Sequence, residues 1–258
     1  MNQTTPRPAQ TYAEAEEALL SRWPEHKLDP TLDRIRDFCS VLGDPQTTYD
    51  VLHITGTNGK TSTARMAERL LITMGLRTGR FTSPHLTSMT ERIVLDGDQL
   101  TDEQFVDAFN DVAPYTHLVD AQHEHPLSFF ETVVAMAYAA FSNAPVDVAV
   151  IEVGMGGAWD ATNVADGKVA VIAPIGLDHA QYLGDSILDI AAEKVGIIKP
   201  GAVCVSAVQQ DEVAALIAQR CAEVGATLLV EGVDFAVERR TPAVGGQMLD
   251  LRGVRGTY

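Results

Sequence analysis

The chain has 258 residues, 46% of them hydrophobic and 21% charged, which is typical of a globular protein with a sizeable core and unlike a disordered chain. Acidic residues number 35 against 19 basic ones, so the net charge is −16. A surface this acidic repels phosphate backbones and anionic lipid, so we expect neither nucleic acid nor a membrane as a partner.

Short apolar runs and helical patterns alternate along the chain after an expected flexible tail at residues 1–10. A capping box at residues 11–14 predicts the start of a first helix. Further helices are expected at 30–42, 60–74, from 101, from 128, at 186–195 and at 211–224. Strands are expected at 51–55, 77–81, 146–153, 169–175, 202–207 and 227–230, and a hairpin arm at 245–251. This alternation predicts an α/β fold, with a mostly parallel sheet and helices on both faces.

The three cysteines, Cys39, Cys204 and Cys221, are odd in number and far apart, and no pair has metal-ligand spacing. They indicate reduced thiols and a cytoplasmic location. No apolar run in the sequence approaches the roughly 18 residues that a membrane helix needs.

A candidate phosphate-binding loop lies between the strand expected at 51–55 and the helix expected at 60–74. Its residues are Gly56, Thr57, Asn58, Gly59, Lys60 and Thr61. The glycines let the backbone approach an anion, and successive N–H groups with the helix N-terminus supply positive charge. Lys60 would reach the β- and γ-phosphates, and the hydroxyl of Thr61 or Ser62 would bind Mg²⁺. The strict motif has a glycine where Ile54 stands, so the alternative is a plain turn with a solvated lysine.

Glu152 ends a predicted buried strand at its carboxyl edge, where ligands of open α/β sheets gather. A carboxylate there suits Mg²⁺, and the alternative is an ion pair with a neighbouring lysine. Ser83 and His179 also follow predicted strands. Taken alone, Ser83 fits a turn serine, and His179 fits a core or cap histidine better than a ligand.

The loop at 56–61 and four later segments resemble the folylpolyglutamate synthase / dihydrofolate synthase family of the Mur ligase superfamily. Those segments, in the family's order, are 82–86, 128–131, 152–163 and 177–199. The resemblance implies a phosphate-loop sheet of the Mur ligase central-domain type. It also implies an ATP-dependent amide ligase of folate biosynthesis. ATP would phosphorylate a carboxylate of dihydropteroate or a folate, and the amine of L-glutamate would then attack the acyl phosphate.

The resemblance assigns roles to individual residues. It implies Lys60, His179 and Lys194 as catalytic residues, with two Mg²⁺ ions held by Ser83, Glu152, His179 and a carbamylated Lys194. It implies pterin or folate contacts from Ser128, Phe129, Phe130, Glu131, Trp159, Asp160 and Ala161. For Lys194 the alternative is an ordinary lysine at a helix C-terminus. For the two phenylalanines the alternative is that both lie in the core.

Members of the resembled family continue into a second, smaller α/β domain. We therefore expect 11–240 to be the ATP-binding domain and 241–258 to begin a connection to a C-terminal ligase domain. We also expect a monomer that does not ligate glutamate by itself. The alternatives are a Mur-type cell-wall peptide ligase, a non-catalytic nucleotide-binding module and a small-molecule kinase. Residues 128–131 argue against the first, and the joint presence of Lys60, Glu152, His179 and Lys194 argues against the second.

Overall fold

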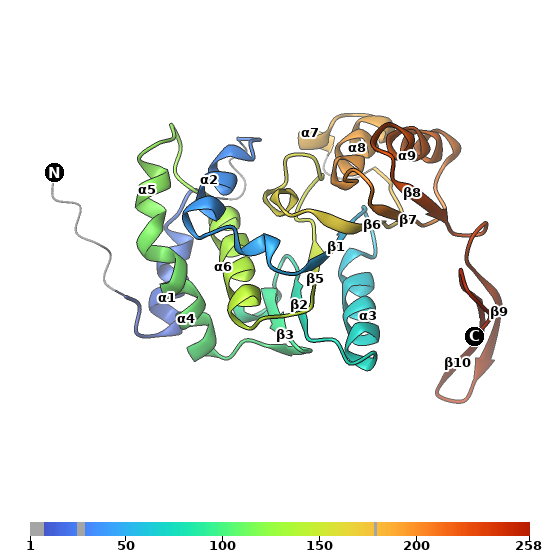
Figure 1. The fold of residues 1–258 in the computed structure, drawn as a ribbon, viewed down its shortest axis with the longest axis horizontal. Helices are drawn as coiled ribbons and strands as arrows, with labels where there is room; N and C mark the ends of the chain where they lie inside the picture. Colours follow the sequence, from blue (N-terminus) through green and yellow to red (C-terminus); the bar gives the residue numbers. More distant parts are fainter. Residues whose placement is uncertain (1–7, 25–28, 178–179) are drawn as a thin grey trace.

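An eight-stranded sheet forms the centre of the computed structural model, which describes residues 8–24, 29–177 and 180–258 (Figure 1). Its strands in spatial order are β4 (Asp98–Gln99), β3 (Ile93–Leu95), β2 (Thr78–Phe81), β5 (Val148–Glu152), β1 (Asp50–Thr55), β6 (Gly167–Ile172), β7 (Val203–Ser206) and β8 (Thr227–Val230). The six strands β2, β5, β1, β6, β7 and β8 are parallel to one another. Strands β3 and β4 form an antiparallel edge beside β2. The parallel strands therefore end at one common edge.

Helices cover both faces of this sheet. They are α1 (Tyr12–Leu20), α2 (Asp33–Val41), α3 (Lys60–Thr73), α4 (Asp102–Val112), α5 (Thr116–Asp120), α6 (Phe129–Asn143), α7 (Ala180–Leu183), α8 (Ile187–Lys194) and α9 (Asp211–Val224). Among the described residues, no helix is long and apolar enough to cross a membrane. A hairpin of β9 (Ala236–Ala243) and β10 (Gly246–Arg252) forms a separate arm beyond β8 (Figure 1).

Successive side chains of a strand point to opposite faces of the sheet, so each face presents its own apolar residues to the helices that pack on it. Ile54 on β1 and Val150 on the adjacent strand β5 lie on one face of the sheet and pack under α3. The residues on the other face, including Val51 and Ala149, join a large core with α6, α4, α2 and α1. On the same face, β6 and β7 pack against α8 and α9. The sheet thus has α3 on one side, and α6, α8 and α9 on the other.

The predicted fold class is confirmed, and the helix at 211–224 and the strand at 227–230 have the predicted bounds. The β3–β4 hairpin was not predicted, although Asp96-Gly97 carries the signal for it. Both residues have positive φ, as a two-residue hairpin turn requires. The hairpin arm begins at Ala236, so the expected boundary at residue 240 falls inside β9. Packing also begins before the expected boundary at residue 10, because Ala9 is buried and its N–H donates to Asn110 Oδ1.

Substitution of Gly79 on β2 tests how tightly the sheet packs on α6. A Cβ at this position would lie 2.5 Å from Cδ1 of the buried Phe141. Gly79→Ala should therefore lower the free energy of unfolding by about 1–3 kcal/mol, measured by denaturant titration. A Cβ at Gly246 in the hairpin arm meets nothing within 4 Å, so Gly246→Ala should change it by less than about 0.5 kcal/mol. Equal effects of the two substitutions would contradict this packing.

Candidate functional site

The loop at 56–61 leaves β1 at the common edge of the sheet and turns directly into α3. Gly56 has φ +147°, and a Cβ there would lie 2.7 Å from Cβ of Ala173. Gly59 has φ +83° and caps the N-terminus of α3. Both positions therefore need glycine. The first N–H groups of α3 have no partner within the helix, and Asn58 and Gly59 are exposed, so these donors are accessible to an anion.

Two lysines meet this loop at a single carbonyl oxygen. Nζ of Lys60 donates to Gly56 O at 3.0 Å and to Thr57 O at 3.4 Å. Nζ of Lys194, from the C-terminal end of α8, donates to the same Gly56 O at 3.1 Å, and Lys194 is 4% exposed. The fold thus gathers positive charge at the loop of a strongly acidic chain.

Glu152 lies at the carboxyl end of β5, next to the loop. Its Oε1 accepts a hydrogen bond from Oγ1 of Thr61 at 2.9 Å. Its Oε2 is buried and has no hydrogen-bond partner among the residues that the structure describes. Burial raises the pKa of Glu152, while the hydrogen bond from Thr61 and the charge of Lys60 oppose the rise. A buried carboxylate oxygen without a partner, beside a hydroxyl, fits a hard divalent cation such as Mg²⁺.

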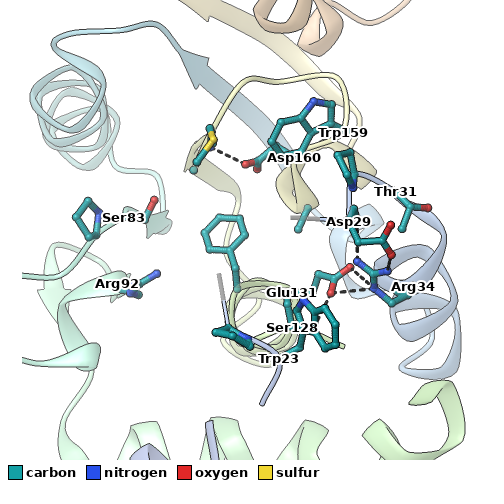
Figure 2. Close-up of a pocket in the computed structure, with 17 residues that line it drawn as sticks. Trp23, Asp29, Thr31, Arg34, Ser83, Arg92, Ser128, Glu131, Trp159 and Asp160 are labelled. Atoms are coloured by element: carbon teal, nitrogen blue, oxygen red, sulfur yellow. Dashed lines mark hydrogen bonds and ion pairs between the residues drawn. The ribbon is translucent and has the colours of Figure 1, made fainter. Parts of the chain in front are cut away.

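A cavity of about 290 Å³, shown in Figure 2, has Gly154, two residues after Glu152, in its lining. Ser83 and Arg92 lie across it from Trp159, Asp160 and Arg34. The full lining is Trp23, Pro24, Asp29, Pro30, Thr31, Arg34, Ser83, Pro84, Arg92, Ser128, Phe130, Glu131, Gly154, Met155, Trp159, Asp160 and Ala161. Aromatic and apolar walls with a few polar groups are typical of pockets for small organic ligands.

The two phenylalanines at the start of α6 point to different places. Phe130 lines the cavity and contacts Gly154, where a Cβ would lie 2.5 Å from Cζ of the ring. Phe129 is buried in the core, and the guanidinium of Arg92 lies 5.0 Å from its ring centroid. Only Phe130 therefore presents its ring to a ligand in the cavity.

Ser128 and Glu131 line the cavity, but their polar atoms bind each other. Ser128 Oγ accepts from the Glu131 N–H at 3.1 Å, and Glu131 Oε2 accepts from the Ser128 N–H at 2.7 Å, a capping box. Glu131 Oε1 also forms an ion pair with Nε of Arg34 at 3.1 Å, and Arg34 pairs with Asp29. These contacts fix the N-terminus of α6 to α2, and with it the position of Phe130.

Asp160 anchors the segment that forms the opposite wall. Its Oδ1 accepts from the Thr162 N–H at 3.0 Å and from the Thr162 hydroxyl, and its Oδ2 accepts from the Met155 N–H at 2.8 Å. Burial raises the pKa of Asp160, and these hydrogen bonds oppose the rise. Trp159 and Ala161 flank Asp160 on the same wall.

The structure brings together most of the residues singled out in the sequence. The loop, Lys194, Glu152, Ser83 and the segments at 128–131 and 159–161 meet at the carboxyl edge of β1, β2 and β5. His179 lies outside the described residues. Sequence reasoning missed Arg34, Arg92 and Trp23 in the cavity wall, because none of them lies within a recognised motif.

Comparisons with known proteins agree with this geometry. The model of the Mur ligase middle domain family matches residues 54–230. A dihydrofolate synthase/folylpolyglutamate synthase of Mycobacterium tuberculosis is 45% identical over 267 residues, which cover 98% of this chain and 55% of the relative. A solved Mycobacterium tuberculosis folylpolyglutamate synthase complexed with ADP has a TM-score of 0.90 at 46% identity, covering 96% of this chain and 56% of that one.

A solved FPGS–AMPPCP–folate complex also has a TM-score of 0.90, at 35% identity, over 96% of this chain and 60% of that one. The chain therefore spans little more than half the length of these relatives. The matches confirm the family resemblance. The family model covers more than half of the chain and includes the loop, Glu152 and Lys194. This chain belongs to the Mur ligase middle domain family.

Proposed function

We propose that this chain is the nucleotide- and pterin-binding part of an ATP-dependent amide ligase. The ligase joins L-glutamate to dihydropteroate, to folates, or to both. The observation that carries the proposal is the place of Glu152 between the two candidate sites. Its carboxylate contacts Thr61 of the loop, and two residues later Gly154 lies in the cavity wall. The relatives named for folylpolyglutamate and dihydrofolate synthesis, solved with ADP or with AMPPCP and folate, support it.

In the proposed reaction, a carboxylate oxygen of the pterin substrate attacks the γ-phosphorus of ATP. The bond from that phosphorus to the bridging oxygen breaks, so ADP leaves and an acyl phosphate forms. The amine of glutamate then attacks the acyl carbon, phosphate leaves, and the nitrogen loses a proton to give the amide. The chain's contribution is to position the reactants and to neutralise charge. Lys60 and the N–H groups at the start of α3 hold the β- and γ-phosphates.

Glu152, with the hydroxyls of Thr61 and Ser83, is proposed to hold Mg²⁺. The fit rests on the unpartnered Oε2 of Glu152 and on the oxygen ligands beside it. The chemistry that Mg²⁺ would supply there is the neutralisation of phosphate charge. The hydrogen bond from Thr61 to Glu152 holds both side chains at the end of the loop.

A second Mg²⁺ is proposed at His179 and Lys194, with Lys194 carried as a carbamate. Carbamate formation needs a neutral amine, which burial favours. Lys194 is 4% exposed and its Nζ already lies 3.1 Å from the loop carbonyl of Gly56. A carbamate would replace a cation at the loop with an oxygen ligand. The burial of Lys194 is the support for this part of the proposal.

The cavity is proposed to take the pterin. Phe130 and Trp159 line it with flat apolar faces, which suit a fused aromatic ring. Asp160 and Ala161 line it beside Trp159, and the lone pairs that Asp160 does not use on Thr162 and Met155 would accept from ring N–H and amino groups. Ser128 and Glu131 act through the capping box that sets the position of Phe130.

We further propose a cytoplasmic monomer in which ligation needs more than these 258 residues. The cytoplasmic location is supported by the three cysteines, which are buried and form no disulfide. The need for further chain is supported by the relatives, of which this chain spans little more than half.

Removal of the Lys60 ammonium should weaken nucleotide binding. Lys60→Ala should raise the Kd for Mg²⁺–AMPPCP, measured by calorimetry, by about 10-fold to 100-fold, because a charge-assisted hydrogen bond is lost. The fold should persist, as judged by circular dichroism. The control is Lys168→Ala, which should leave the Kd unchanged. Lys168 forms an exposed ion pair with Asp50 at the amino ends of β6 and β1, at the end of the sheet opposite the loop. An unchanged Kd in Lys60→Ala would remove the loop from the proposed site.

Truncation of the Phe130 ring should weaken folate binding without affecting the nucleotide. Phe130→Ala should raise the Kd for folate by about 5-fold to 30-fold, through loss of an aromatic contact, and leave the Kd for AMPPCP within about 2-fold. Phe105→Leu, in the core beneath α1, should lower thermal stability without changing the Kd for folate. A cavity that binds a UDP-muramyl peptide and no folate would favour the cell-wall ligase instead.

A further inference from the structure

Two side chains on one face of β1 are bonded to the segment that forms the cavity wall. Oγ1 of Thr55 donates to Gly156 O at 2.9 Å, and Nε2 of His53 lies 2.9 Å from Oγ1 of Thr162. Residues 53 and 55 share a face because side chains alternate along a strand. Both are fully buried. The strand that ends in the phosphate loop therefore also fixes the segment between Gly156 and Thr162 at both its ends.

The hydrogen bond of Thr55 is one of three hydrogen bonds that link the loop, the wall segment and the end of α8 in a closed ring. From Gly156 the wall segment continues to Ala158, whose N–H donates to Glu193 O at 2.8 Å. Lys194, which follows Glu193 in the chain, donates from its Nζ to Gly56 O. Gly56 follows Thr55 in the chain, and this closes the ring. The ring is tightly packed, since a Cβ on Gly157 would lie 2.6 Å from Glu193 O. A shift of one member therefore has to move the others.

Nucleotide binding changes the surroundings of this ring at Gly56. In the structure, the Gly56 carbonyl accepts from Lys60 and from Lys194. The Lys60 ammonium has three donors and already binds the carbonyls of Gly56 and Thr57, so a phosphate oxygen that it also binds competes with these contacts of the loop. Competition of this kind is what one site needs in order to bias another.

We propose that the Thr55 hydroxyl is a positioning group that couples nucleotide binding at the loop to the cavity wall at residues 154–160. The inference rests on the proposed function, because it takes the loop as the nucleotide site and the cavity as the folate site. Through its bond to Gly156, Thr55 holds the wall segment in register with the loop. Occupancy of the loop then sets the affinity of the cavity, and the reverse follows by linkage.

The test is to remove the hydroxyl and keep the shape. Thr55→Val replaces the donor with a methyl group, and Thr55→Ser restores it. Thr78→Val is the matched control, because Thr78 is equally buried on β2, on the far side of β5 from β1, and its hydroxyl has no hydrogen-bond partner among the described residues. For each protein, the Kd for folate is measured with and without Mg²⁺–AMPPCP. Hydrogen exchange of the amides at 154–160 is followed in the same samples.

In the unaltered chain, AMPPCP should change the Kd for folate by about 5-fold or more and should alter the exchange of residues 154–160. Thr55→Val should still bind AMPPCP, but the change in the Kd should fall to within about 2-fold, and the exchange response should be lost. Thr55→Ser and Thr78→Val should behave as the unaltered chain. Retained AMPPCP binding in Thr55→Val, together with restored coupling in Thr55→Ser, separates lost coupling from lost stability.

Three results would overturn the coupling and leave the proposed function standing. The first is binding of both ligands to the unaltered chain with no effect of one on the other. The second is full coupling in Thr55→Val. The third is loss of AMPPCP binding in Thr55→Val, which would make Thr55 a part of the nucleotide site. Failure of AMPPCP to bind the unaltered chain would instead overturn the proposed function, and this inference with it.

Discussion

The hydrogen bond between Thr61 and Glu152 joins the two halves of the site, and the rest of the arrangement depends on it. β1 and β5 are parallel neighbours, with Ile54 opposite Glu152, so the segments that follow them start side by side. The first continues into α3 on one face of the sheet. The second turns toward the other face and forms the cavity wall. Ligand sites of open α/β sheets form where neighbouring connections diverge in this way.

Charge is distributed in the site against the trend of the whole molecule. The chain carries a net charge of −16, yet two lysines converge on the carbonyl of Gly56. Beside them, Glu152 is buried with one oxygen unpartnered among the described residues. A buried carboxylate is costly without a counter-charge, and the Mg²⁺ proposed at this site would supply one. The local arrangement, and not the net charge, therefore governs which ligand the site accepts.

The sequence predicted the features that depend on local pattern. Gly56 and Gly59 marked the loop, the apolar run before Glu152 marked a buried strand, and Ser128 with Glu131 marked the start of α6. It could not predict features set by packing between distant segments. Arg34 reaches Glu131 from 97 residues away along the chain, and no local pattern encodes that pair.

The same limit applies to how a predicted residue is used. The sequence marked Phe129 and Phe130 together, but only the packing against Gly154 directs Phe130 to the cavity. It marked Lys194 as a possible metal-site residue, but not its contact with Gly56. No sequence pattern distinguishes Thr55 from other strand residues, because its bond to Gly156 is set by the fold. Chemistry-bearing residues are thus visible in sequence, whereas their partners emerge from the fold.

The most direct test of the account is a crystal structure of the chain with AMPPCP and Mn²⁺, whose anomalous scattering locates the metal. The account predicts an anomalous peak at the carboxylate of Glu152, with the terminal phosphate of AMPPCP on the N–H groups of Gly59 and Lys60. A nucleotide bound away from the loop at 56–61, or a metal peak remote from Glu152, would contradict it.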